Sequence, residues 1–180
     1  MEDFLNPREV LDKLNLKEDM AAADFGSGSG GWVLPLAKIL GKGLPAGRQG
    51  KVYAIDVLKE PLSALQSKAS LQKLLNIQTI RSNVEGANGS KLPDSSVDLI
   101  LMTNLLFQVE DKKAVLEEAK RALKNKGQIL VVDWLPESVL GPKEGRLSPA
   151  DVREIADKIG LKCKKDFMAG SCHWGMVLVK

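Results

Sequence analysis

The chain has 180 residues, of which 44% are hydrophobic and 27% charged, and its formal net charge is +3. These values are typical of one soluble globular domain, and so mild a charge gives no reason to expect a nucleic-acid partner. Cys163 and Cys172 are too few for a disulfide framework or a structural zinc site, so no metal site is predicted. No apolar run approaches the ~20 residues of a membrane span, and the N-terminus lacks a signal-peptide pattern. We therefore expect a cytoplasmic protein with one domain over residues 1–180.

The predicted elements alternate between helix and strand. In chain order they are a helix at 6–16, a strand at 20–25, a helix at 32–40, a strand at 52–55, a helix at 61–75, strands at 77–80 and 97–102, a helix at 111–126, a strand at 128–133 and a helix at 148–159. Two more strand-like runs, 161–168 and 174–179, flank the hairpin signal Ala169-Gly170-Ser171. This alternation predicts a doubly wound α/β domain with a parallel sheet and a terminal antiparallel hairpin.

Three segments stand outside this core pattern. Residues 41–50 contain four glycines and a proline between a helix and a strand, longer than such connections usually are. We interpret them as an insertion at the sheet edge opposite the ligand crevice. Residues 1–19, with their predicted helix, and residues 135–147 are the segments available as lids over a substrate.

Ligands of such sheets bind beyond the carboxyl ends of the strands. The first predicted strand runs into the glycine-rich residues 26–31, where a ligand can approach the backbone and a helix N-terminus favours an anion or carboxylate. Asp56 follows the second strand, where a carboxylate can accept hydrogen bonds from two ribose hydroxyls. Together these features predict a nucleoside ligand.

The glycine pattern fits two kinds of cofactor. Gly26, Gly28 and Gly31 match the G-x-G-x-x-G pattern of dinucleotide sites, whereas Gly26, Gly28 and Gly30 match G-x-G-x-G. From Gly26 to Asp56 the spacing is 56 − 26 = 30 residues, longer than the ≈ 20 of dinucleotide folds. The predicted insertion lies between these two positions, so the spacing leaves both cofactors open.

The wider set of motifs resembles the class I S-adenosylmethionine-dependent methyltransferases. The likeness extends over residues 23–30 (ADFGSGSG), 52–56 (VYAID), 82–85 (SNVE), 91–100 (KLPDSSVDLI) and 116–133. It is greatest to the methyltransferases of ubiquinone and menaquinone biosynthesis. The resemblance implies a Rossmann-like, seven-stranded, mostly parallel sheet in the order 3-2-1-4-5-7-6, with strand 7 antiparallel. It also implies S-adenosylmethionine as the cofactor.

Ten residues would then bind the cofactor: Asp24, Gly26, Ser27, Gly28, Gly30, Asp56, Val57, Asn83, Val84 and Thr103. The resemblance implies that Asp24 holds the amino group of the cofactor, that Asp56 binds the ribose and that Val57 packs on the adenine. Asn83 stands where the family usually has an aspartate. Its amide can accept a hydrogen bond from the adenine amino group without charge assistance, which predicts weaker cofactor binding.

The residues that would act on the acceptor are harder to identify. Methyl transfer from a sulfonium is an in-line displacement in which alignment supplies much of the rate, and a base is needed only if the acceptor loses a proton. Asn104 and Asp133, after the fourth and fifth strands, are the candidate catalytic residues, although Asp133 fits a helix cap or solvated acid equally well. His173, the single histidine, and Trp134 fit packing roles better.

The sequence therefore predicts an enzyme, an S-adenosylmethionine-dependent methyltransferase with a small-molecule acceptor. The chain lacks the Asn-Pro-Pro-Tyr-like and Pro-Cys motifs of several nucleic-acid methyltransferases, which disfavours a nucleic-acid acceptor. The alternatives are a non-catalytic relative that binds the cofactor or a partner protein, and a methyltransferase acting on RNA or protein. An NAD-dependent oxidoreductase is the least favoured. The oligomeric state is left open.

Overall fold

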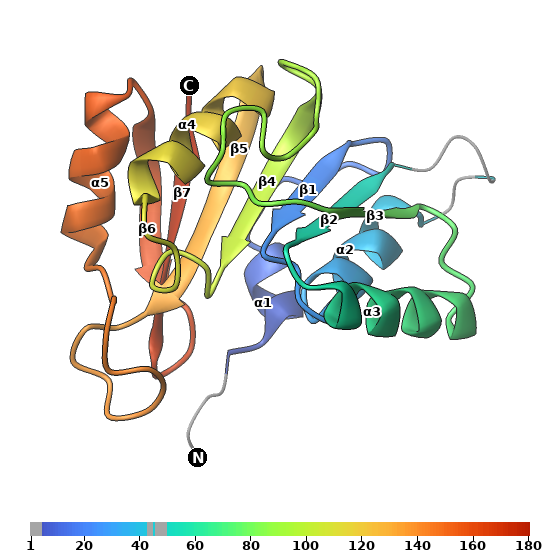
Figure 1. Ribbon diagram of the computed structural model, residues 1–180, viewed down its shortest axis with the longest axis horizontal. Helices are drawn as coiled ribbons and strands as arrows, with labels where there is room; N and C mark the ends of the chain where they lie inside the picture. Colours follow the sequence, from blue (N-terminus) through green and yellow to red (C-terminus); the bar gives the residue numbers. More distant parts are fainter. Residues whose placement is uncertain (1–4, 43–44, 46–49) are drawn as a thin grey trace.

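The computed structural model describes residues 5–42, 45 and 50–180, and its seven strands form one sheet with helices on both faces (Figure 1). The strands are β1 (Ala22–Phe25), β2 (Val52–Asp56), β3 (Ile77–Arg81), β4 (Val97–Thr103), β5 (Leu123–Trp134), β6 (Lys162–Met168) and β7 (His173–Val179). The helices are α1 (Pro7–Leu11), α2 (Val33–Leu40), α3 (Lys59–Leu71), α4 (Lys112–Ala122) and α5 (Pro149–Lys158).

The order of the strands is β3-β2-β1-β4-β5-β7-β6. The pairs among β1 to β5 are parallel, whereas β7 is antiparallel to both β5 and β6. This architecture confirms the predicted fold. Because β7 runs against its neighbours, its first residue, rather than its last, lies at the edge where β1, β4 and β5 end.

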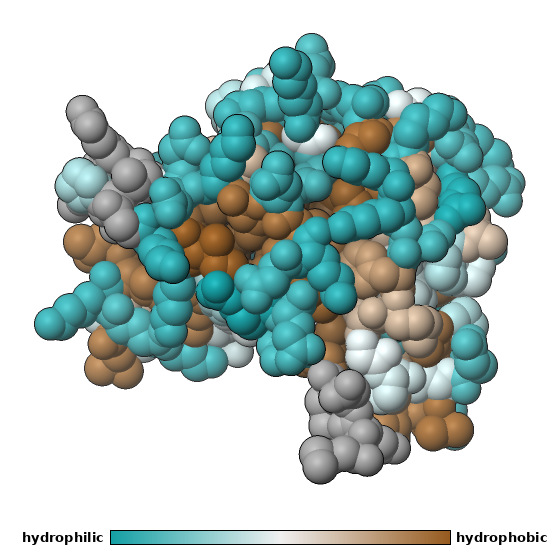
Figure 2. Space-filling model, turned by 180° about the vertical axis from the view of Figure 1, so that it is seen from behind, coloured by the Kyte–Doolittle hydropathy of each residue, from teal (hydrophilic) through white to brown (hydrophobic). Residues whose placement is uncertain are grey.

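Two apolar cores cover the sheet. One packs α4 and α5 against one face, and the other packs α1, α2 and α3 against the opposite face. All four residues of β1 are buried because it lies between β2 and β4 with helices on both sides. From the side opposite to Figure 1, hydrophilic side chains cover most of the surface around a hydrophobic hollow near its centre (Figure 2).

Side-chain caps fix two of the helix starts where the sequence places them. The Asp111 carboxylate accepts a 2.9 Å hydrogen bond from the Ala114 N–H at the start of α4. Ser148 and Asp151 form a reciprocal capping box at the start of α5. Gly160, in the left-handed region at φ 77°, follows the end of α5, as predicted.

Several predicted boundaries are wrong. α1 ends at Leu11 rather than near residue 16. α3 begins at Lys59 and ends at Leu71, so Pro61 lies inside the first turn, where backbone N–H groups need no partner within the helix. Gly127 does not end a helix but lies within β5, which begins directly after α4. A register shift between β4 and β5 accommodates this early start.

Two expectations are only partly covered by the described residues. Of the predicted insertion, residues 43–44 and 46–49 lie outside the described part of the chain, and of the predicted N-terminal lid, residues 1–4 do. Among residues 5–42, 45 and 50–180, no helix is both long and apolar enough to cross a membrane.

Candidate cofactor site

The glycine-rich segment joins the end of β1 to the start of α2 and is tied to β2. The N–H groups of Gly26 and Ser27 both donate to the Ile55 carbonyl, at 2.8 and 3.0 Å. Gly26 has a φ of 73°, and a Cβ at this position would lie 2.8 Å from the Leu105 side chain. Glycine is therefore required here both by the backbone conformation and by the close approach of Leu105.

Asp56 connects this segment to the turn after β2. Its Oδ2 accepts a 2.8 Å hydrogen bond from the Gly28 N–H, and its Oδ1 accepts a 2.9 Å bond from the Leu58 N–H. Each carboxylate oxygen can accept more than one hydrogen bond. The carboxylate can thus hold the loop in place and still accept hydrogen bonds from a ligand.

A cavity of about 460 Å³ opens beside these residues, within the size range of small-molecule sites. Its walls come from the ends of β1 and β2, from the segment after β3 and from the segment after β4. The lining residues are Gly26, Gly28, Ile55, Asp56, Val57, Leu58, Pro61, Ser82, Asn83, Val84, Glu85, Leu105, Gln108 and Val109. Val57 and Leu58 are about half exposed, which gives the opening an apolar side. The structure therefore gathers six of the ten predicted cofactor residues around one cavity.

Asp24 is the most unusual polar group of this region. It lies in β1, two residues before Gly26, and its side chain is 1% exposed. Neither carboxylate oxygen accepts a hydrogen bond from the described residues. Burial, and to a lesser extent the neighbouring Asp56, raise its pKa well above the ordinary value for aspartate. A buried carboxylate without a partner is costly, and a ligand ammonium group would satisfy it.

The other three predicted cofactor residues do not line the cavity. Ser27 is 6% exposed and its hydroxyl has no partner among the described residues. A Cβ on Gly30 would lie 2.3 Å from the Leu65 side chain, so this glycine permits packing against α3. Thr103, the last residue of β4, is buried. Their predicted contacts with the cofactor stay predictions.

The segment after β3 is braced by side chains. The Asn83 Oδ1 accepts a 3.0 Å hydrogen bond from the Glu85 N–H. The Glu85 carboxylate in turn accepts 2.9 Å bonds from the N–H groups of Glu110 and Asp111 just before α4. Glu85 therefore connects two walls of the cavity, a role that its place in the SNVE motif alone did not indicate.

The two candidate catalytic residues differ in their surroundings. Asn104 lies directly after β4 at a φ of 52°, and its buried Oδ1 has no partner among the described residues. Asp133 is 1% exposed, and its carboxylate accepts hydrogen bonds from the N–H groups of Phe107, at 3.3 Å, and Trp134, at 2.8 Å. Burial raises the pKa of Asp133 to about 6. Asp133 thus braces the segment after β4, whereas Asn104 keeps an unused acceptor.

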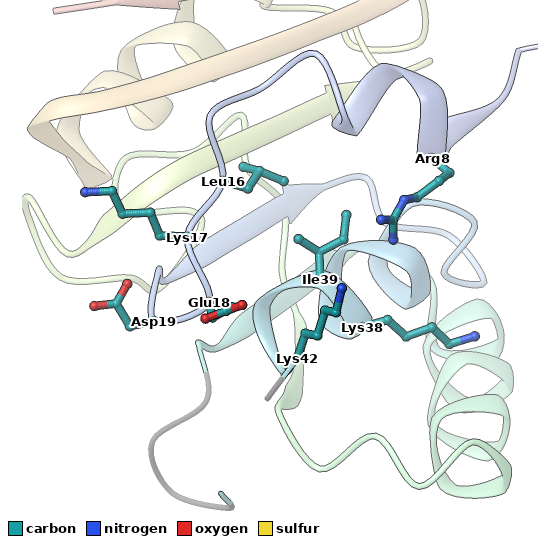
Figure 3. Close-up of a pocket in the computed structure, with 8 residues that line it drawn as sticks. All are labelled: Arg8, Leu16, Lys17, Glu18, Asp19, Lys38, Ile39 and Lys42. Carbon is teal, nitrogen blue, oxygen red and sulfur yellow. The ribbon is translucent and has the colours of Figure 1, made fainter. Parts of the chain in front are cut away.

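Leu105, Gln108 and Val109 complete the cavity wall and were not predicted. They follow β4 by two to six residues, so the rule that ligands bind beyond strand ends could have indicated them. A larger cavity, of about 630 Å³, lies elsewhere, between α1, the segment before β1 and the end of α2. Figure 3 shows the Arg8 and Lys42 side chains approaching Ile39 there. No predicted cofactor residue lines this second cavity.

Comparison with known proteins agrees with this geometry. A family model described as a methyltransferase domain matches residues 16–164. The chain belongs to this methyltransferase domain family. The family resemblance and the fold expected from the sequence are thereby confirmed.

Solved structures support the same assignment for this methyltransferase domain. A SAM-dependent methyltransferase from Aquifex aeolicus matches with a TM-score of 0.85 and 30% identity, over 97% of this chain and 89% of that one. A putative type 11 methyltransferase from Sulfolobus solfataricus matches with a TM-score of 0.71 and 26% identity, over 90% and 84%.

A curated relative is also similar. The demethylmenaquinone methyltransferase of Geobacillus sp. (strain WCH70) is 25% identical over 133 residues, which are 74% of this chain and 53% of that protein. The methyltransferase domain therefore spans about half the length of the curated relatives that it matches.

Proposed function

We propose that this methyltransferase domain transfers a methyl group from S-adenosylmethionine to a small-molecule acceptor. The observation that carries the proposal is Asp24, a buried carboxylate whose two oxygens lack partners among the described residues. The methionine part of S-adenosylmethionine has an ammonium group that would pair with it. The adjoining cavity offers Asp56 for the ribose hydroxyls and an apolar side for the adenine.

The remaining cofactor contacts follow from the walls of the cavity. Val57 and Val84 would enclose the adenine, and Asn83 would face its amino group. Because the Asn83 Oδ1 already accepts a bond from Glu85, it has one lone pair left and no negative charge to offer. This supports the expectation that the adenine end is held less tightly than an aspartate would hold it.

The residues near the acceptor would act by alignment. The bound cofactor supplies an electrophilic methyl group, and the protein orients the two molecules. We favour Asn104 as a residue that contacts the acceptor, because its oxygen is buried without a partner. Asp133 already accepts backbone hydrogen bonds, so its proposed role is to position the segment after β4.

The nature of the acceptor rests on the relatives. Those named demethylmenaquinone methyltransferase favour a small molecule, and demethylmenaquinone is the first compound to test. A cytoplasmic location remains part of the proposal. An RNA or protein acceptor and a non-catalytic role are the outcomes against which the assay must discriminate.

Calorimetric titration with S-adenosylhomocysteine, the product form of the cofactor, tests the proposal. Wild type should bind it, and Asp56→Ala should weaken binding by about 1.5–3 kcal/mol, because a charged hydrogen-bond acceptor is lost. Asp19→Ala, which removes an exposed carboxylate far from the cavity, is the matched control and should bind like wild type. Binding of NAD instead would refute the cofactor assignment. A turnover assay identifies the acceptor class. Formation of S-adenosylhomocysteine with a small molecule, but not with RNA or protein, would establish a small-molecule acceptor. No turnover with any acceptor would favour a non-catalytic relative.

A further inference from the structure

His173, the single histidine of the chain, is buried without hydrogen bonds. Its side chain is 5% exposed, and neither ring nitrogen has a partner among the described residues. An imidazole carries at least one N–H donor and, when neutral, one acceptor, and burying both unpaired is costly. Buried polar groups in folded proteins nearly always have partners. A ligand at this position would supply the missing partner.

The antiparallel direction of β7 places this histidine at the ligand edge of the sheet. His173 is the first residue of β7 and pairs with Trp134, the last residue of β5. Their rings lie in contact, with centroids 4.0 Å apart and planes tilted by 38°. An aromatic surface and an unsatisfied polar group therefore lie together where the parallel strands end.

The strand registers connect this pair to the cofactor residues. Trp134 lies two residues after Val132, which pairs with Thr103, and Thr103 lies two residues after Leu101, which pairs with Asp24. Paired residues, and residues two apart on a strand, point to the same face of a sheet. The histidine therefore shares its face with Thr103 and Asp24. Two strand spacings of about 4.8 Å and two residues of about 3.3 Å separate it from Thr103, about 12 Å in all.

A loop held by one side chain covers this region. Residues 135–147 follow β5, and within the described part of the chain every hydrogen bond that Arg146 donates goes to a carbonyl of the same loop. These carbonyls belong to Leu135, Pro136, Ser138, Leu140 and Pro142. A Cβ on Gly141 would lie 2.6 Å from the Trp134 ring, and the Arg146 guanidinium lies 5.9 Å from it. The loop thus closes against Trp134.

The same loop exposes apolar side chains. Val139 is 91% exposed and Leu140 is 41% exposed. Segments with few buried apolar contacts open at low free-energy cost compared with the core of a domain. Opening of this loop would uncover the Trp134 ring, against which His173 packs.

We infer that His173 and Trp134 form the acceptor subsite of this methyltransferase domain, and that they take a planar aromatic molecule with a hydroxyl group beneath the loop of residues 135–147. The Trp134 ring stacks on the acceptor, and His173 exchanges a hydrogen bond with its hydroxyl. Burial, and then the nearby Arg146 charge, lower the pKa of His173. The ring is therefore neutral near pH 7 and has one nitrogen to donate and one to accept. This inference rests on the proposed function.

The single histidine also provides the test. After removal of any affinity tag, the Hε1 and Hδ2 proton signals of His173 are the only histidine signals in the spectrum. We would titrate 1-naphthol, a planar hydroxylated probe, into the protein saturated with S-adenosylhomocysteine. Both signals should shift and saturate. Signals that stay fixed while naphthol is in excess would overturn the inference, and this arm requires no variant.

A variant pair separates the hydrogen bond from the stacking. His173→Phe keeps a ring and removes both nitrogens, so it should bind naphthol about tenfold more weakly than wild type. Naphthalene, which lacks the hydroxyl, should bind both proteins equally. Arg146→Lys should strengthen naphthol binding because it releases the loop. Equal naphthol binding by wild type and His173→Phe would refute the role of the histidine.

Failure of this inference is distinguishable from failure of the proposed function. His173 is not among the cofactor residues, so His173→Phe should bind S-adenosylhomocysteine within about twofold of wild type. If wild type does not bind S-adenosylhomocysteine, the proposed function fails first. If it binds and the histidine signals ignore naphthol, only the acceptor subsite is wrong.

Discussion

Replacing Asp24 with asparagine tests whether the free protein contains an unpaired buried carboxylate. The side chain is 1% exposed, and no described residue donates a hydrogen bond to it. Burial first, and Asp56 second, raise its pKa well above the ordinary value. Asparagine has nearly the same shape and no charge. It therefore imitates the protonated aspartic acid at every pH.

The sign and size of the effect follow from the raised pKa. The folded protein holds this proton more tightly than the unfolded chain, whose aspartate pKa is about 3.9. The stability of wild type is therefore complete below that pH and falls as the pH rises through the folded pKa, by about 1.4 kcal/mol per pH unit. Asp24→Asn should match wild type near pH 4. At pH 8 it should be more stable by the free energy that wild type has lost by then, about 1.4 kcal/mol for each pH unit over which the folded protein keeps the proton and the unfolded chain does not.

Urea denaturation at pH 4, 6 and 8, with and without S-adenosylmethionine, measures these free energies. Saturating cofactor should reverse the order at pH 8, because its ammonium group pairs with the carboxylate of wild type only. Asp19→Asn, a change at an exposed carboxylate, should stay within about 0.5 kcal/mol of wild type throughout. If Asp24→Asn is the less stable protein at pH 8 without cofactor, the carboxylate has a partner and the reasoning is wrong.

Two further substitutions test the supports of the site, and a third tests a buried ion pair within α4. Gly26→Ala should destabilise by about 1–2 kcal/mol and weaken S-adenosylhomocysteine binding, since its φ is 73° and its Cβ would meet Leu105 at 2.8 Å; an unchanged urea midpoint would contradict this. Arg121→Met leaves the 4% exposed Glu118 without its ion pair and should cost about 3 kcal/mol near pH 7 by urea denaturation. Burial raises the pKa of Glu118, but hydrogen bonds, among them the one from Arg121, hold this pKa below its ordinary value. The cost of Arg121→Met should therefore shrink as the pH falls through the pKa of Glu118 in the folded protein. A cost that does not change with pH would exclude the ion pair as the cause of the destabilisation. Asp133→Ala leaves two backbone N–H groups without their acceptor and should cost about 1–3 kcal/mol while lowering S-adenosylhomocysteine affinity in calorimetry; weaker binding with unchanged stability would contradict a positioning role.

Local sequence signals predicted the elements where a side chain fixes the boundary. Asp111 and Ser148 cap their helices with hydrogen bonds, and both starts were predicted correctly. The start of α3 was missed because Leu58, at its N-cap position, makes no side-chain capping bond. Gly127 was taken as a helix end because nothing in the local pattern shows that β5 begins without an intervening loop. The strand order came from the family resemblance, since it depends on contacts between distant segments.

In the site too, some residues could be predicted from local sequence signals, whereas others depend on contacts between distant segments. Asp56 is the last residue of β2, and its place at a strand end was enough to predict it at the cavity. Asn83 lies two residues after β3, and only the family resemblance predicted it as a cofactor residue. Leu105 was missed because the conformation of the segment after β4, in which Asn104 adopts a positive φ, does not show in the sequence. That Asp24 lacks a partner is a property of the packed interior, so the sequence could suggest its role but not the energetic reason for it.

β6 forms one edge of the sheet. β6, one of the edge strands, carries Lys162, Lys164 and Lys165 on exposed positions. An unpaired strand edge invites other chains to add to it, and lysines on such an edge discourage this addition. Neutralising these three lysines, by acetylation or by glutamine substitution, should therefore allow β6 of one molecule to pair with an edge strand of another. The solubility of the protein at high concentration thus depends on charges at the β6 end of the sheet.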